Sequence, residues 1–197
     1  MTESEWLAGK PADEMLDAVA DRLTQRRWRL LGAAFARKLW DLLPPDPLRD
    51  AVEYVERTEP IPTPAAAAWI DRIGGASDEL ISQARDAIRE PVRNVEALAP
   101  ADPDVPPEYP SEVLHRAAVG FAQGAVHNAG EAVTFAADAI RLLFKEPGPE
   151  AFDQLLTAVK EADSFHTSAR QSLVNARKMA EEGDAYADRY VPKTARL

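Results

Sequence analysis

The stretch SEVLHRAAVGFAQGAVHNAGEAVTFAADAIRLLFKEPGPEAFDQLL, residues 111–156, decides how this chain of 197 residues folds. Up to Lys145, apolar residues recur every three or four positions, which is the spacing of one face of an α-helix. Pro-Gly-Pro at 147–149 then interrupts the pattern, and Pro149 suits the first position of a new helix. We therefore predict one helix from 111 to about 145 and a second from 149 to about 182, joined as a hairpin.

Both predicted helices carry a heptad pattern, with an apolar seam and a companion row made mostly of alanines. When the hairpin closes at 146–148, the two polar exceptions in the seam, Asn128 and His166, face each other. This register predicts a buried Asn128–His166 hydrogen bond. The seam consists of Leu114, Phe121, Asn128, Phe135 and Leu142 on the first helix and Phe152, Val159, His166, Leu173 and Ala180 on the second. The companions are Ala118, Ala125, Ala132 and Ala139, and then Leu155, Ala162, Ala169 and Ala176.

The predicted polar pair has two interpretations. In the structural one, a polar pair in an apolar seam fixes the register of the hairpin at some cost in stability. In the functional one, it belongs to a ligand or metal site, for which His127, Glu131 and Asp163 lie close in sequence. Neither helix carries the Glu-x-x-His motif of di-metal bundles, and His127 projects away from the seam. We therefore expect no metal and no cofactor.

The rest of the chain is also predicted to be helical, because no alternating run rich in Val or Ile occurs. The prolines of APADPDVPPEYP exclude a helix there, so 100–110 is a linker between an N-terminal subdomain at 1–99 and the hairpin at 111–190, with a tail at 191–197. The Gly74-Gly75 pair is expected to end a helix. The predicted fold class is all-α, with a cluster of short N-terminal helices packed on the long hairpin as one continuous bundle.

The first long helix carries more apolar surface than one partner helix can cover. Its second stripe requires a third element, supplied by the N-terminal helices or by another copy of the chain. Opposite this stripe, Ala117, Gly120 and Gly124 form a small-residue patch. The patch favours either close packing of another helix of the same chain or contact with a second protein, although Gly-x-x-x-Gly is a weak signal outside membranes. The second stripe is Val119, Val126, Val133 and Ile140, flanked by Ala122, Ala129, Ala136 and Leu143.

The most basic stretch begins at Thr24, a predicted helix cap, and has no acidic residue between Leu23 and Trp40. Its apolar stripe faces inward and its basic side chains face outward. We expect the basic side chains to be solvated or paired within the fold, or else to bind an external polyanion. Trp40 lies off the stripe. The stripe is Trp28, Leu31, Phe35, Leu39 and Leu42, the basic residues are Arg26, Arg27, Arg29, Arg37 and Lys38, and the candidate partner surface is Arg29, Arg37 and Trp40.

Composition excludes several classes of function. The chain has no cysteine, so it holds no disulfide framework, thiol nucleophile or Cys-ligated metal. Its net charge of −10 disfavours binding to nucleic acid. The acidic N-terminus is not a secretory signal, and no apolar stretch approaches the roughly 20 residues of a membrane span, so we expect a cytoplasmic protein with no membrane contact. The common catalytic and nucleotide-binding motifs are missing.

Residues 2–58 contain the phrases TESEWLAGKP, RRWRLLGAAFARKLWDLLP and LRDAVEYVER. This segment resembles a recurrent helical module of planctomycete-type bacterial proteins to which no activity is assigned. The family's basic helix is usually cysteine-rich where this chain reads GAAFA, so any role of those cysteines is absent. The resemblance implies a bacterial, cytosolic helical module and no catalytic residue. The matching positions are Trp6, Leu7, Arg29, Arg37, Trp40, Arg49, Ala51, Val52, Glu53, Glu56 and Arg57.

These observations favour a non-catalytic protein-interaction, scaffolding or regulatory module of a bacterial cytosolic protein. Its expected partner is another protein or a second copy of the chain. Two alternatives stay open. One is a ligand- or metal-binding helical bundle, with or without enzymatic activity, that uses Asn128 and His166. The other is a polyanion-binding protein that uses the basic helix at 26–38.

Overall fold

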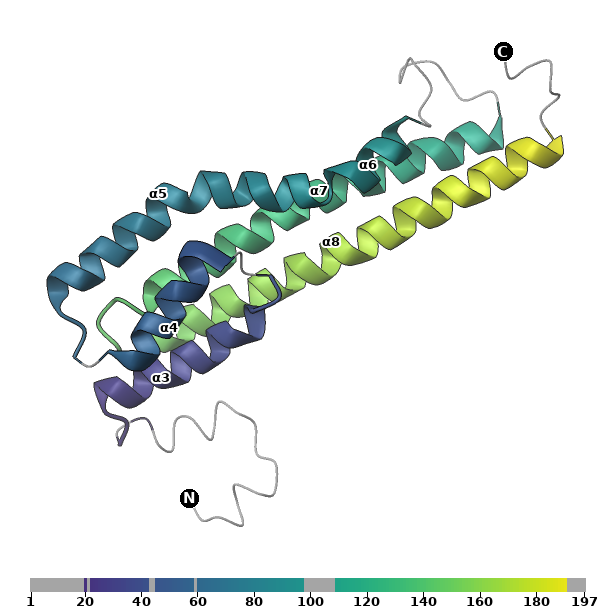
Figure 1. Cartoon of the computed structure of the whole chain (residues 1–197). Coiled ribbons are helices and arrows are strands. Elements are labelled where there is room, and N and C mark those ends of the chain that lie inside the picture. Colours follow the sequence, from purple (N-terminus) through teal and green to yellow (C-terminus); the bar gives the residue numbers. More distant parts are fainter. Residues whose placement is uncertain (1–19, 21, 43–44, 59, 98–108, 191–197) are drawn as a thin grey trace, which may run out of the picture. The chain divides into compact units, whose positions relative to one another are not determined.

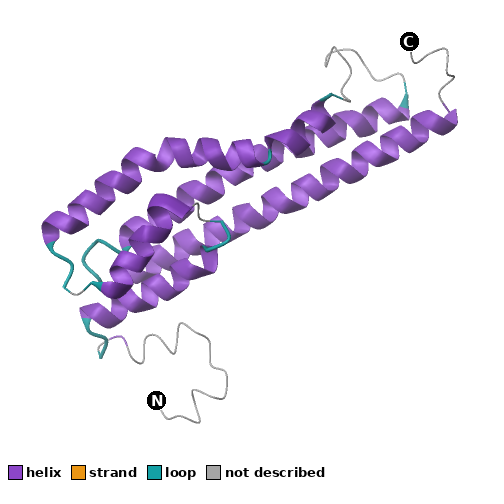
Figure 2. Cartoon of the chain, viewed as in Figure 1, coloured by secondary structure: helices purple, strands orange, loops and turns teal. Residues whose placement is uncertain are grey.

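The computed structural model describes residues 20, 22–42, 45–58, 60–97 and 109–190. Within them every regular element is a helix and no strand occurs, so the all-α prediction is confirmed (Figure 2). Trp6, Leu7 and the predicted tail at 191–197 lie outside the described residues, as does most of the predicted linker. The elements labelled in Figure 1, together with two short turns η1 and η2, are α3 (Gln25–Ala36), η1 (Arg37–Leu39), η2 (Pro45–Arg49), α4 (Asp50–Arg57), α5 (Thr63–Ala87), α6 (Arg89–Glu96), α7 (Pro110–Leu142) and α8 (Pro149–Tyr190).

The two long helices, α7 and α8, begin where the sequence predicts and end differently. After Leu142 the backbone N–H groups of 143–145 donate to carbonyls three residues back, at 3.1–3.2 Å, so the last turn is tightened and no longer α-helical. Helix α8 continues past 182 to Tyr190. The expected stop at Gly74-Gly75 was wrong, because α5 runs through both glycines. A glycine inside a helix costs roughly 1 kcal/mol relative to alanine, but it does not by itself end the helix.

The chain divides into two compact units. Unit 1 comprises Met1–Gly75 and Ala136–Val159, and unit 2 comprises Ala76–Phe135 and Lys160–Leu197. Neither unit follows the predicted boundary at 100–110, because α5, α7 and α8 each contribute residues to both units. Each unit therefore combines part of the N-terminal half with part of the hairpin.

In unit 1, helix α3 is buried on two sides, whereas the sequence predicts one stripe. Trp28 and Leu39 are buried as predicted. Ala33 and Ala36 are also fully buried, because α4 packs along α3. The buried arc is therefore wider than predicted and its centre is displaced toward the alanines. The half-exposed members of the predicted stripe are Leu31, Phe35 and Leu42.

Aromatic rings join α3 to the hairpin end in unit 1. The ring of Phe152, in the first turn of α8, lies 5.3 Å from the ring of Trp28 and 5.6 Å from that of Phe35. Such tilted and edge-on pairs contribute beyond the apolar area they bury. A second aromatic cluster, with centroid distances of 5.5–6.3 Å, consists of Tyr54, Trp69 and Phe144.

In unit 2, helices α6, α7 and α8 pack around a cluster made mainly of small side chains. Val119 and Val126 of the second stripe pack against this cluster, to which α6 contributes two valines. The prediction that a third element covers the second stripe is confirmed for unit 2. The cluster consists of Val92, Val95, Ala118, Ala122, Ala176 and Ala180.

The predicted seam of α7 lies at the edge of the buried arc in unit 2. Ala118 and Ala125 are fully buried, whereas Phe121 is 39% exposed. The added α6 contact draws the centre of the arc toward the second stripe, away from the seam. Asn128 and His166 are consequently half-buried, and no hydrogen bond joins them within the described residues. The burial predicted for this pair was wrong, and its role as register pin or ligand site stays a prediction.

Candidate functional site

Arg26, on the basic face of α3, forms hydrogen bonds with the end of α4 inside unit 1. Arg26 Nη1 donates hydrogen bonds of 3.0 Å to the carbonyl oxygens of Val55 and Thr58, and Nη2 donates one of 2.6 Å to that of Glu56. The last carbonyls of a helix have no partner within it and carry the negative end of its dipole. A forked guanidinium can satisfy several of them at once. Arg26 is therefore a C-terminal cap for α4, at a position the sequence places on the solvent side.

Arg37 and Trp40, two members of the predicted partner surface, lie together in unit 1 and contact their own chain. The Nε and Nη2 atoms of Arg37 each donate a 2.6 Å hydrogen bond to a carboxylate oxygen of Glu56. The Arg37 guanidinium carbon also lies 4.5 Å from the centroid of the Trp40 ring, and that of Arg49 lies 5.4 Å from it. These contacts give Arg37 and Trp40 a structural role. Their use as a partner surface stays a prediction.

Glu56 titrates at a lower pH than an ordinary glutamate. The side-chain hydrogen bond from Arg37, with the positive charges of Arg37 and Arg57, lowers the pKa of Glu56 below its usual 4.5, although partial burial opposes the change. The same hydrogen bond raises the pKa of Arg37. Both directions show that the pair favours its charged form.

We expect Glu56→Gln to lower the free energy of unfolding by about 0.5–1 kcal/mol at neutral pH, since the pair is bidentate but partly exposed. The folded-state pKa of Glu56 is depressed, so this stabilisation is present above the unfolded-state value near 4.5 and is lost as the pH falls through the folded-state value. Urea unfolding of both proteins should show a difference at neutral pH that disappears in strong acid. Arg37→Gln should cost a similar amount, and the double variant little more than either single one. A difference independent of pH would contradict the pairing.

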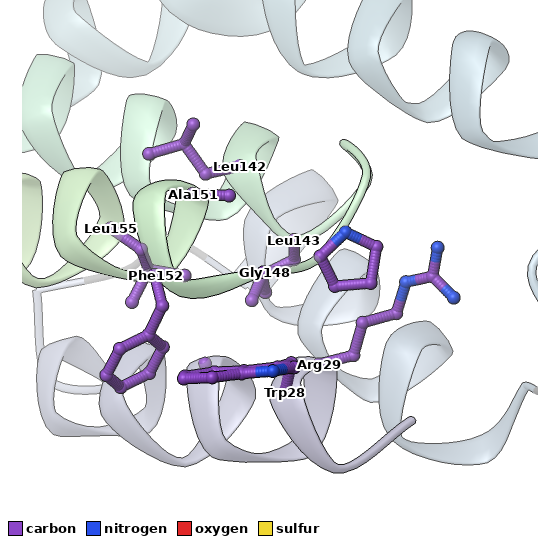
Figure 3. A pocket seen from close by; sticks show the side chains of 10 residues that line it. Trp28, Arg29, Leu142, Leu143, Gly148, Ala151, Phe152 and Leu155 are labelled. Carbon is purple, nitrogen blue, oxygen red and sulfur yellow. The ribbon is translucent and has the colours of Figure 1, made fainter. Parts of the chain in front are cut away.

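Arg29, the third member of the predicted partner surface, lies at a cavity that neither Arg37 nor Trp40 lines. In Figure 3 its side chain extends past the Trp28 ring near the turn that carries Gly148. Its Nε is buried and has no acceptor within the described residues. The cavity encloses about 20 Å³, which is room for one water-sized group. It is too small for a cofactor or an organic substrate.

One stripe of α7 in unit 2 leaves apolar surface open. A Cβ atom added at Gly120 or Gly124 would have no atom within 4 Å, so neither glycine serves close packing against the described chain. No helix of the described part of the chain packs closely on these two glycines, and both interpretations of the small-residue patch stay predictions. Nearby, Val113 is 52% exposed and Phe121 is 39% exposed. At about 100° per residue, five residues of α7 lie within an arc of roughly 100°. We call this surface the α7 outer face; it consists of Val113, Ala117, Gly120, Phe121 and Gly124.

A groove of about 330 Å³ lies between α6 and α8 in unit 2. Its floor is apolar, since Val95 and Ala180 are 6% and 7% exposed and Pro91 lies beside them. Its rim carries four exposed polar side chains, none of which forms a hydrogen bond or ion pair within the described part of the chain. The groove was not predicted from the sequence, because each of its two walls has the pattern of an ordinary polar helix surface. The rim consists of Glu90, Asn94, Arg177 and Glu181.

His115 of α7 contacts α8 in unit 2 and has a structural role. His115 Nε2 lies 3.1 Å from Asp184 Oδ1, and the imidazole ring packs so closely on Gly183 that a Cβ atom there would clash with the ring. Gly183 thus lets α8 approach the His115 side chain of α7. Among the described residues no group of three or more His, Asp and Glu side chains is placed to hold a metal.

None of the described helices is long and apolar enough to cross a membrane. No family model, curated protein or solved structure matches the chain. The resemblance of residues 2–58 to a bacterial module therefore stays a prediction.

Proposed function

We propose that the chain is a non-catalytic interaction module that associates with a second copy of itself through the α7 outer face. This proposal rests on one observation: no other atom lies within 4 Å of a Cβ atom added at Gly120 or Gly124, and the exposed ring of Phe121 lies beside them. A helical glycine costs roughly 1 kcal/mol relative to alanine, and no closer contact within the described residues offsets that cost here. Exposed aromatic and aliphatic side chains beside open backbone suit contact with another helix.

Antiparallel pairing with a second copy fits the spacing of the two glycines. A two-fold axis at their midpoint sets Gly120 of one copy opposite Gly124 of the other. The two helix backbones can then approach closely at the centre of the contact. The lack of cysteine and the resemblance of residues 2–58 to a bacterial module support a bacterial, cytosolic setting for this association.

The double variant Gly120→Ala/Gly124→Ala separates fold from function. We expect its free energy of unfolding, measured at a concentration where the chain is monomeric, to rise by about 1–2 kcal/mol, because each alanine gains helix propensity in open space. Self-association should weaken at least about tenfold, because two methyl groups hold the partner backbone away. Urea unfolding and sedimentation velocity measure the two effects.

The matched control is Gly75→Ala in α5, where an added Cβ also meets nothing within 4 Å. It should gain stability without any change in self-association. If the double variant associated as tightly as the wild type, the α7 outer face would not be the interface.

A further inference from the structure

We propose that the groove between α6 and α8 binds a small zwitterion, an aliphatic α-amino acid, with Glu90, Glu181 and Arg177 as its charged contacts. This site lies away from the α7 outer face and does not depend on self-association. The groove of about 330 Å³ is at the lower end of the size range of small-molecule sites. Such sites combine an apolar lining with a few convergent polar groups, as this groove does.

The sequence places the lining residues on one face of each helix. On α6 the lining residues are two adjacent pairs that lie one helical turn apart, at 90–91 and 94–95. On α8 they are residue 177 and, one turn later, residues 180 and 181. The small side chain of Ala180 and the ring of Pro91 leave space above the floor, while Val95 anchors α6 in the core of unit 2. The floor therefore suits a short aliphatic side chain and offers it no hydrogen bond.

The rim carries charges of both signs that do not neutralise each other. Arg177 and Glu181 have the helical spacing that favours an ion pair, yet they form none within the described residues. The next residues along α8, Lys178 and Glu182, have the same spacing and lie 3.8 Å apart. The guanidinium N–H groups of Arg177 can therefore donate to an external acceptor, and the carboxylate oxygens of Glu90 and Glu181 can accept from an external donor.

An α-amino acid supplies both partners within a few bonds. Its ammonium group donates to carboxylates such as Glu90 and Glu181, and its carboxylate accepts from the guanidinium of Arg177 and the side-chain amide of Asn94. A simple cation would leave Arg177 without a partner, and a simple anion would meet two like charges. The charge pattern of the rim therefore selects a zwitterion over either ion alone.

Titration of the full chain with L-leucine, followed by amide cross-peaks in NMR spectra, tests the proposal. We expect saturable shifts at Val95 and Ala180, and binding at least about tenfold weaker for leucinamide and for N-acetyl-leucine, each of which lacks one charge. Arg177→Gln and Glu181→Gln should each weaken L-leucine binding by a similar factor.

The matched control is Lys178→Gln, which changes the neighbouring charge outside the groove and should bind L-leucine like the wild type. All these side chains are exposed, so the variants should keep the dispersion of the wild-type spectrum. No saturable shift with L-leucine, or equal binding by the two blocked analogues, would overturn the proposal. Shifts in the Gly120 and Gly124 region alone would likewise assign the effect to self-association and reject the groove as the site.

Discussion

Replacing Phe152 with alanine is expected to lower the free energy of unfolding by about 3–5 kcal/mol, the largest effect among the substitutions considered. Phe152 is 4% exposed, and its ring contacts Trp28 and Phe35 of α3. The substitution removes both aromatic contacts and leaves a cavity that the rigid helix ends cannot close. Urea unfolding monitored by tryptophan fluorescence measures the loss, since Trp28, Trp40 and Trp69 all belong to unit 1.

Phe121→Ala is the matched control, because it removes the same side chain from a position that is 39% exposed. Measured on the monomeric chain, it should cost less than about 1 kcal/mol. Equal costs for the two phenylalanines would contradict the packing described for unit 1.

Replacing Arg26 with methionine is expected to cost about 2–3 kcal/mol. Methionine keeps the apolar stem of the side chain but removes the donors to the carbonyls of Val55, Glu56 and Thr58. Hydrogen bonds from a charged donor contribute about 1.5–3 kcal/mol, and the carbonyls at the C-terminal end of α4 would lose their guanidinium partner. Arg26→Lys should recover part of the loss, because it restores the charge but not the fork.

Arg27→Met provides the comparison for Arg26. Arg27 is exposed, and its backbone N–H donates a hydrogen bond to the Thr24 side chain, which the substitution keeps. Its cost should stay within about 0.5 kcal/mol. If Arg27→Met and Arg26→Met were equally mild, the basic face of α3 would be free for a partner and the capping role of Arg26 would be wrong.

Helical periodicity predicted the all-α fold and the hairpin turn, because both depend on local signals. The 3.6-residue pattern and the Pro-Gly-Pro break need no knowledge of distant contacts. The ends of α7 and α8 were less predictable, because the tightened turn at 143–145 and the extension to Tyr190 depend on packing. The two glycines at 74–75 likewise stay helical because nothing there requires a left-handed residue.

The position of the buried arc could not be predicted from either helix alone. The hairpin register treated Asn128 and His166 as central, but the contact of α6 with α7 shifts the centre toward Ala118 and Ala122. The same limitation applies to Arg26, whose acceptors belong to α4. It also applies to the groove, whose two walls are about 85 positions apart in the chain. The small-residue patch with Gly120 and Gly124 could be predicted from the sequence. The empty space around the two glycines could not, because it depends on which helices pack nearby.

Sedimentation equilibrium of the untagged wild-type chain over a wide range of concentrations is the most direct test of the α7 outer face as an interface. The proposed function predicts a reversible equilibrium between a single chain and a dimer, with the dimer increasing at higher concentration. A mass equal to one chain at every concentration would contradict it.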